Sequence, residues 1–158
     1  MGEDGIHFVS QATPSALARS TEGLKLSTAD GRQYGPFDAL IWAVGREPST
    51  NDLNLAAAGV LTDAKGFITT DKYQVTNVPH VYALGDVTGR AALTPVAVAA
   101  GRRTADRVFG GMAGRHLDYH YIPTVIFSHP PIGTCGFSES AARRHFGEPV
   151  KCYTSEFV

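Results

Sequence analysis

An apolar run that ends on Gly85-Asp86, just before a well-marked helix start, constrains this chain more than any other feature. The run is HVYAL at residues 80–84, which predicts a buried strand. Eight residues after Asp86, Thr94-Pro95 opens the helix, since threonine suits the N-cap and proline the first helical position. Gly110-Gly111 stops it. A strand, a turn and a helix in this order predict an α/β fold, in which ligands bind beyond the carboxyl ends of strands.

The residues before residue 46 are expected to form a β-meander that leads into a buried strand. Short strand patterns occur at 6–9, 16–19 and 24–26, and Asp30-Gly31 is a hairpin turn signal. The nearly continuous apolar run FDALIWAV at 37–44 is typical of a strand covered on both faces.

Shorter elements are expected after the polar stretch REPSTN, which we interpret as a crossing segment between structural units. They are two helical turns at 52–59 with Gly59 as C-cap, a turn at 63–66, strands at 67–70, 124–127 and 150–157, and a helix from the cap Ser138 to Gly147. The apolar first half of the long helix, residues 96–100, is expected to be buried.

Composition removes several classes of function. The chain carries 14 Lys and Arg against 15 Asp and Glu, with no basic block, which argues against nucleic-acid binding. No run approaches the roughly 20 apolar residues that cross a bilayer. The acidic, glycine-rich start at residues 1–5 predicts a cytoplasmic chain. Cys135 and Cys152 match no metal or redox spacing and are interpreted as inert packing thiols.

Two residues stand out as candidate ligand-binding groups. The carboxylate of Asp86 could accept hydrogen bonds from a sugar or ribitol hydroxyl, although a simple Gly-Asp turn explains the same dipeptide. The free N–H groups at Thr94 would favour negative charge on a bound ring such as a reduced flavin, although a capped core helix also fits. His116 and His120 lack a third ligand, so no metal site is predicted.

Longer strings carry a resemblance to a known family. They are GDVTGRAALTPVAVAAGRRTADRVF, IPTVIFSHPPIGTCGFSE, IWAVGREPST, LAAAGV and TNVPHVYALGDV. Together they closely resemble the carboxyl-terminal half of the glutathione reductases, within the class I pyridine nucleotide-disulfide oxidoreductases that use FAD and NAD(P)H. The resemblance covers residues 40–158 closely and the meander more loosely. The combination of AAGR with FSHPPIG favours glutathione reductases over the trypanothione and thioredoxin reductases, which stay open as alternatives.

The resemblance implies a role for six residues. Asp86 is similar to the residue that holds the FAD ribitol, and Thr94 to the one whose backbone N–H meets the flavin pyrimidine edge. Arg102 is similar to the arginine that binds a glutathione carboxylate, which suits a guanidinium fork. The positions where family members contact NADPH are Gly45, Ala92 and Val125.

The resemblance also implies parts of three domains. Residues 1–46 would end the NAD(P)-binding domain, 47–120 would form the returning segment of the FAD-binding domain, and 121–158 would begin an α+β dimerisation domain. The intact enzyme, a homodimer, passes electrons from NADPH through FAD and a redox cysteine pair to glutathione disulfide. This chain has no G-x-G-x-x-G motif and no redox cysteine pair, and the family's catalytic histidine belongs to a later segment.

We therefore expect a fragment that contains no catalytic residue, is inactive alone and dissolves poorly. A non-catalytic remnant module is the alternative from a different functional class.

Overall fold

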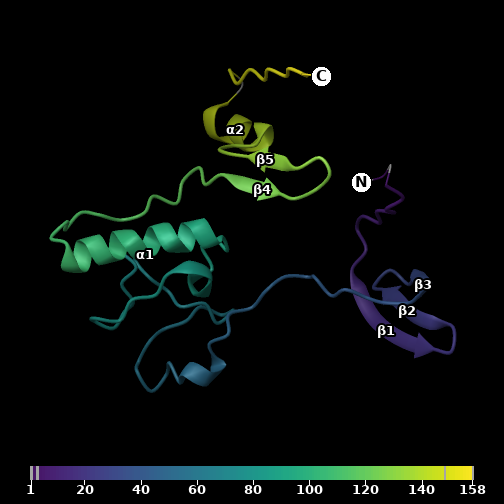
Figure 1. The fold of residues 1–158 in the computed structure, drawn as a ribbon, viewed down its shortest axis with the longest axis horizontal. Helices are drawn as coiled ribbons and strands as arrows, with labels where there is room; N and C mark the ends of the chain where they lie inside the picture. Colours follow the sequence, from purple (N-terminus) through teal and green to yellow (C-terminus); the bar gives the residue numbers. More distant parts are fainter. Residues whose placement is uncertain (1, 3, 148, 158) are drawn as a thin grey trace. The chain divides into compact units, whose positions relative to one another are not determined.

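The computed structural model describes residues 2, 4–147 and 149–157, which contain both helices and strands (Figure 1). This mixed content agrees with the predicted α/β class. Contacts divide the chain into two compact units, which are described separately. The first comprises residues 1–45 with 128–130, and the second 46–127 with 131–158. The assignment to parts of three domains stays a prediction.

The first unit is an antiparallel meander of three strands in the order β1-β2-β3. The strands are β1 (Pro14–Ser20), β2 (Gly23–Thr28) and β3 (Gln33–Phe37). The hairpin turn predicted at Asp30-Gly31 is confirmed. The carboxylate of Asp30 accepts hydrogen bonds from Thr28 Oγ1 at 2.5 Å and from Arg32 Nε at 2.6 Å, which locks the turn.

Two of the strands predicted in this unit are absent. Residues 6–9 and 38–44 have no strand structure, and Ile41, Trp42 and Val44 are 88%, 60% and 64% exposed. A strand covered on both faces needs neighbouring strands and covering helices. No described strand pairs with residues 38–44, so these residues have no ladder to join.

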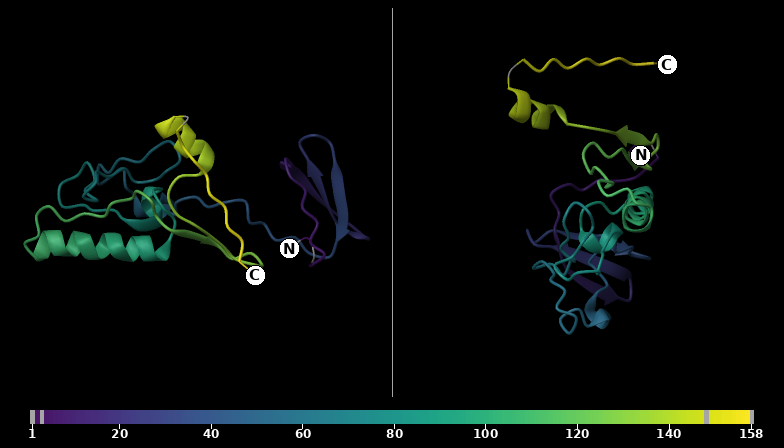
Figure 2. Two further views of the ribbon diagram at one scale, coloured as in Figure 1. Left: turned by 90° about the horizontal axis from the view of Figure 1, so that it is seen from above. Right: turned by 90° about the vertical axis from the view of Figure 1, so that its left-hand side faces the viewer.

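The second unit has its core in the segment between residues 55 and 87. Val60, Ile68 and Ala83 are buried, and four half-buried side chains pack against them: Leu55, Val78, Val81 and Val87. Two short 3₁₀ helices, η1 (Asn51–Leu53) and η2 (Gly85–Thr88), precede the long helix α1 (Thr94–Phe109). Helix α1 runs beside the loops that hold this core (Figure 2).

The short elements predicted between residues 52 and 84 are only partly present. Residues 54–59 form successive tight turns rather than α-helix, although Gly59, with φ of +69°, ends them in a left-handed conformation. The strands predicted at 67–70 and 80–84 are wrong. Each is reduced to one isolated bridge, Thr62 with Ile68 and Val75 with Tyr82, because no longer partner lies beside it.

Helix α1 has the predicted length, but its N-cap residue differs from the prediction. Thr94 is the first helical residue and Leu93 is the N-cap, without a side-chain hydrogen bond. The helix ends at Gly110 as predicted. Of the apolar stretch 96–100, Val96 and Ala100 are buried, whereas Val98 is 46% exposed, because only one face of the helix meets the core.

The last part of the second unit holds a two-stranded antiparallel sheet and a short helix. They are β4 (Thr124–Ile126), β5 (Ile132–Thr134) and α2 (Glu139–Phe146). Ser138 caps α2 as predicted, since its side chain accepts a hydrogen bond from the N–H of Ala141 at 3.3 Å. The strand predicted at 150–157 is wrong, because this segment is exposed and pairs with no described strand.

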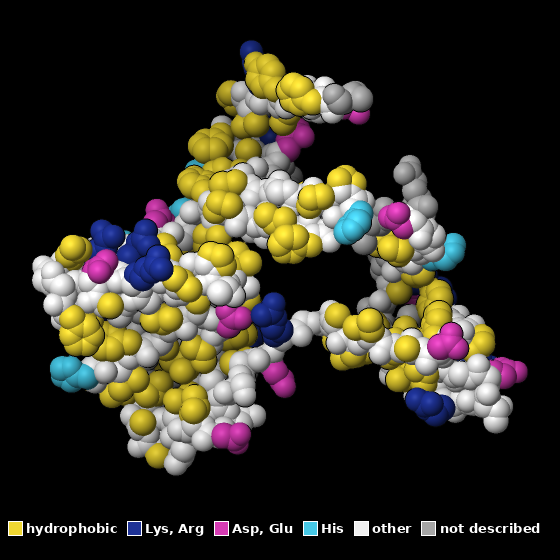
Figure 3. Space-filling model, in the orientation of Figure 1, with side chains coloured by type: hydrophobic (Ala, Val, Ile, Leu, Met, Phe, Trp, Pro, Cys, Tyr) yellow, Lys and Arg dark blue, Asp and Glu magenta, His cyan; other side chains and the backbone are white. Residues whose placement is uncertain are grey.

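The surface of these elements carries exposed apolar side chains, many of them visible in Figure 3. Phe127, Tyr153 and Phe157 are each 87% exposed or more. Both cysteines are free and exposed as well, so the prediction that Cys135 and Cys152 are packed is wrong. Each lies outside the regular elements, where no core covers its thiol.

Candidate functional site

The turn that carries Asp86 is built tightly against α1. Asp86 lies in the first turn of η2, directly after the buried Gly85, whose φ is +74°. A Cβ on Gly85 would come within 3.1 Å of the Cβ of Ala97, so η2 and α1 approach as closely as their backbones allow. The hydroxyl of Thr88 donates to the Gly85 carbonyl at 2.8 Å and closes the turn.

The carboxylate of Asp86 is open to solvent and forms an ion pair with Arg46. Its side chain is 53% exposed, and Arg46 Nη1 lies 3.2 Å from its Oδ2. Arg46 is itself 76% exposed, so solvent screens this ion pair and leaves the carboxylate able to accept other hydrogen bonds. From the sequence, residues 46–51 are interpreted only as a connecting stretch, so Arg46 is not predicted as a site residue. Its partner is 40 residues away, and no local pattern reveals it.

Thr94 lies at the positive end of α1. As the first helical residue, it presents a backbone N–H that has no acceptor within the helix. Its side chain is exposed, and the helix dipole adds partial positive charge at this end. Because η2 packs against α1, the structure brings the elements that carry Asp86 and Thr94 together.

Arg102 differs from the other arginines in the second half of α1. Arg103 donates to the carbonyl of Ala99 within its own helix, at 3.3 Å. Arg107 donates to the Tyr73 carbonyl at 2.8 Å and lies over the ring of Tyr73. Arg102 is exposed and makes no hydrogen bond or ion pair within the described part of the chain, so its guanidinium is available to a ligand.

The three residues predicted to contact NADPH lie in three different settings. Gly45 is the last residue of the first unit, has φ of +124° and has open space around it. The buried strand that should have ended at Gly45 is absent. Ala92 is exposed in the loop before α1. Val125 lies on β4 and is 48% exposed.

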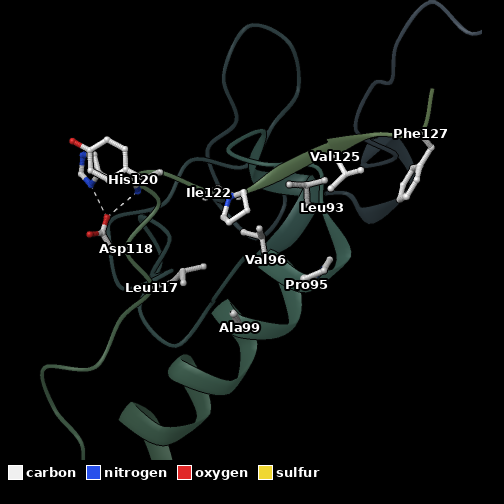
Figure 4. Close-up of a pocket in the computed structure, with 12 residues that line it drawn as sticks. Leu93, Pro95, Val96, Ala99, Leu117, Asp118, His120, Ile122, Val125 and Phe127 are labelled. Carbon is white, nitrogen blue, oxygen red and sulfur yellow. Dashed lines mark hydrogen bonds and ion pairs between the residues drawn. The ribbon is translucent and has the colours of Figure 1, made fainter. Parts of the chain in front are cut away.

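Val125 also lines a pocket of about 560 Å³ in the second unit (Figure 4). The first turns of α1 form one wall, and residues 117–127 form the other. Most lining side chains are apolar, while Asp118 and His120 stand at one side. The N–H of His120 donates to Asp118 Oδ1 at 2.9 Å, and this bond and the nearby His120 ring lower the pKa of Asp118.

Neither a metal cluster nor a transmembrane helix is found in the part of the chain that the structure describes. His116 Nδ1 lies 3.0 Å from the Gly114 carbonyl oxygen, and His120 Nδ1 lies 2.5 Å from Asp118 Oδ1. Within residues 2, 4–147 and 149–157, no three His, Cys, Asp or Glu side chains gather in a way that could hold a metal ion. No described helix is long and apolar enough to cross a bilayer.

Comparison with curated proteins gives two strong similarities. The chain is 51% identical over 129 residues to glutathione reductase from Schizosaccharomyces pombe, covering 81% of this chain and 28% of that protein. It is 40% identical over 162 residues to glutathione reductase from Yarrowia lipolytica, covering 99% of this chain and 34% of that protein. The chain therefore spans about a third of the length of these relatives or less.

Solved structures confirm the fold class. The HOCl-induced flavoprotein disulfide reductase RclA from Escherichia coli superposes with a TM-score of 0.79 at 25% identity, covering 90% of this chain and 32% of that one. LpdA from Mycobacterium tuberculosis shares the fold with a TM-score of 0.80 at 24% identity, over 91% of this chain and 31% of that one. The family model for pyridine nucleotide-disulphide oxidoreductases matches residues 1–101. The chain belongs to this family.

Proposed function

We propose that the protein to which this segment belongs is a glutathione-disulfide reductase that uses FAD and NADPH. Two relatives that are 51% and 40% identical to the chain carry the name glutathione reductase, which supports this assignment. The observation that carries the proposal is the packing of η2, which carries the half-exposed Asp86 carboxylate, against α1, whose first residue presents a backbone N–H without an acceptor in the helix.

This arrangement fits FAD. The Asp86 carboxylate offers acceptors for the ribitol hydroxyls, because among the described residues a solvent-screened ion pair with Arg46 is the only interaction that engages it. The N–H of Thr94 offers a donor to the pyrimidine edge of the flavin, and the positive end of α1 favours negative charge there. When bound, FAD relays an electron pair from NADPH to the disulfide substrate, so that NADPH, a proton and glutathione disulfide yield NADP⁺ and two glutathione thiols.

Arg102 is the proposed substrate-binding residue. Its guanidinium is exposed and has no partner in the described residues, and glutathione carries carboxylates that a guanidinium binds in a bidentate way. Gly45, Ala92 and Val125 are proposed to contact NADPH. They are supported by the resemblance and, for Val125, by its place in the pocket beside α1.

The proposed assembly follows the family. Residues 1–46, 47–120 and 121–158 are assigned to the NAD(P)-binding, FAD-binding and dimerisation domains of a homodimer. A cytoplasmic location is supported by the two free thiols, since disulfides are rare in that compartment.

Arg102→Ala in the full-length protein tests the substrate. A lost guanidinium–carboxylate bond should raise the KM for glutathione disulfide about 10- to 100-fold, with kcat much less affected. Arg144→Ala is the matched control, because Arg144 is exposed on α2 and has no hydrogen bond or ion pair among the described residues. An unchanged KM in Arg102→Ala would contradict glutathione as the substrate and favour trypanothione or another disulfide.

Asp86→Ala tests the flavin site directly. The apoprotein of this variant should bind FAD about 10-fold more weakly or worse, measured by quenching of flavin fluorescence, because a charged acceptor is lost. Wild-type affinity in Asp86→Ala would contradict the proposed site, and a full-length protein that binds no flavin would support the non-catalytic remnant.

A further inference from the structure

The loop that joins Asp86 to Thr94 has little structure of its own. Residues 89–93 form neither helix nor strand. Within the loop, the N–H of Leu93 bonds to the Ala91 carbonyl, and the N–H of Gly89 bonds back to Asp86. The packing of Gly85 on Ala97 brings η2 against α1, and the course of the loop between them depends in addition on what holds it from outside.

One outside contact is made by Gly89, which has φ of +68°. A Cβ there would come within 2.9 Å of the Phe67 ring, so the loop backbone lies against that ring. This contact holds the first residue of the loop, and residues 90–93 lie beyond it.

Arg90 supplies a second contact from outside the loop. Its Nη2 donates to the carbonyl oxygens of Thr70 at 2.5 Å and of Asp71 at 2.7 Å. Its guanidinium carbon lies 5.2 Å from the centroid of the Tyr119 ring. The side chain thus ties the loop to two segments that lie 19 and 29 residues away along the chain.

The turn that contains the Asp71 carbonyl, which accepts a hydrogen bond from Arg90, is held by hydrogen bonds of its own. The carboxylate of Asp71 accepts hydrogen bonds from the N–H groups of Tyr73 at 2.8 Å and Val75 at 3.0 Å. The N–H of Asp71 donates to the Val75 carbonyl at 3.0 Å. Arg90 therefore binds a turn whose conformation is fixed, and through Arg90 this turn can hold the loop in one position.

We propose that Arg90 is a positioning residue that, together with the packing of Gly85 on Ala97, holds the Asp86 carboxylate and the N-terminus of α1 at a fixed spacing, and thereby strengthens FAD binding. Its role is indirect, because it acts through the Asp86 carboxylate and the N-terminus of α1. The inference rests on the proposed function, because it takes the Asp86–Thr94 arrangement to be the flavin site.

The contacts of Arg90 define an informative pair of substitutions. Both hydrogen bonds come from one nitrogen, and the ring contact needs only a positive charge. A lysine keeps the positive charge and a donor to the carbonyls, but its nitrogen stands one bond short of Nη2, so it keeps only part of these interactions. Methionine keeps the apolar stem and none of the three interactions. Arg144→Met is the control for the same substitution at an exposed arginine without a hydrogen bond or ion pair in the described residues.

The experiment uses the full-length protein, freed of flavin and titrated with FAD while flavin fluorescence is followed. Arg90→Met should raise the apparent Kd about five- to ten-fold, and the Kd of Arg90→Lys should lie between those of the wild type and Arg90→Met. The visible circular dichroism of bound flavin should shift toward free FAD in Arg90→Met alone, because the ring is held less firmly.

The outcomes separate this inference from the function on which it rests. Wild-type FAD affinity in Asp86→Ala overturns the proposed flavin site. A weakened Asp86→Ala together with wild-type affinity in Arg90→Met overturns the positioning role and leaves the function intact. An Arg90→Lys variant that binds FAD no better than Arg90→Met also overturns it, as does a lower melting temperature of apo Arg90→Met with unchanged affinity. If Arg90→Met does not fold, Arg90→Gln replaces it with the same expected weakening.

Discussion

Thr76 offers a sharp test of the hydrogen bonds that hold the segment leading to Asp86. It is 8% exposed, and its hydroxyl donates toward the carbonyls of Val78 at 3.1 Å and Val81 at 3.0 Å. The same oxygen accepts the N–H of Val78 at 3.1 Å. One side chain thus closes the loop 76–81, immediately before the residues that end on Gly85-Asp86.

Thr76→Val keeps the shape of the side chain and removes only the hydroxyl. The N–H of Val78 then loses its acceptor in a half-buried place, while the Val81 carbonyl keeps the backbone N–H of Thr76. A net hydrogen bond is worth about 1 kcal/mol and an unsatisfied buried group costs about 1–3 kcal/mol, so we expect a loss of about 2 kcal/mol in unfolding free energy.

Urea unfolding of the chain, followed by far-UV circular dichroism from α1 and α2, measures this loss. Thr76→Ser is the matched control, because it keeps the hydroxyl and gives up only one methyl group, worth about 1 kcal/mol or less. Equal stability of Thr76→Val and the wild type would refute the reasoning. So would a serine variant that is as unstable as the valine variant.

Two further predictions concern backbone and charge. Gly85→Ala should lower the free energy of unfolding by about 1–3 kcal/mol, measured in urea, because its φ of +74° and its close approach to Ala97 both oppose a Cβ. Gly111→Ala is the control: Gly111 has a similar φ of +71° but open space around a Cβ, so this variant should lose less unfolding free energy, from the backbone conformation alone. The pKa of Asp30 is held well below its usual range by the hydrogen bond from Arg32, so this stabilisation is present above the unfolded pKa of about 3.9 and is lost as pH falls below it. Arg32→Gln should return that pKa toward its usual value in an NMR titration of the carboxyl carbon, and an unchanged pKa would contradict the assignment.

The features that the sequence predicts correctly are those whose cause is local. Ser138 caps α2 because a serine hydroxyl needs only an N–H three residues ahead. Gly59 ends a series of turns with its positive φ, and Gly110 ends α1 with its N–H bonded to the Asp106 carbonyl. Asp30 closes its hairpin through bonds to residues two positions away.

The features that fail depend on distant partners. The run 37–44 has the composition of a buried strand, but burial needs neighbours that no pattern within the run supplies. Arg46 and Arg90 are missed for the same reason, since their partners lie 40 and about 20 residues away in the sequence.

The two kinds of arginine on α1 have a consequence for how the protein can vary. Arg107 lies over the rings of Tyr73 and Tyr82 and bonds to a backbone carbonyl, so exchanging it disturbs packing. Arg102 makes no hydrogen bond, ion pair or ring contact with the described residues. Exchanges at Arg102 should leave the helix intact, and under the proposed function they would change only how the substrate is bound. Substrate preference could then evolve on this helix without a cost to the stability of the fold.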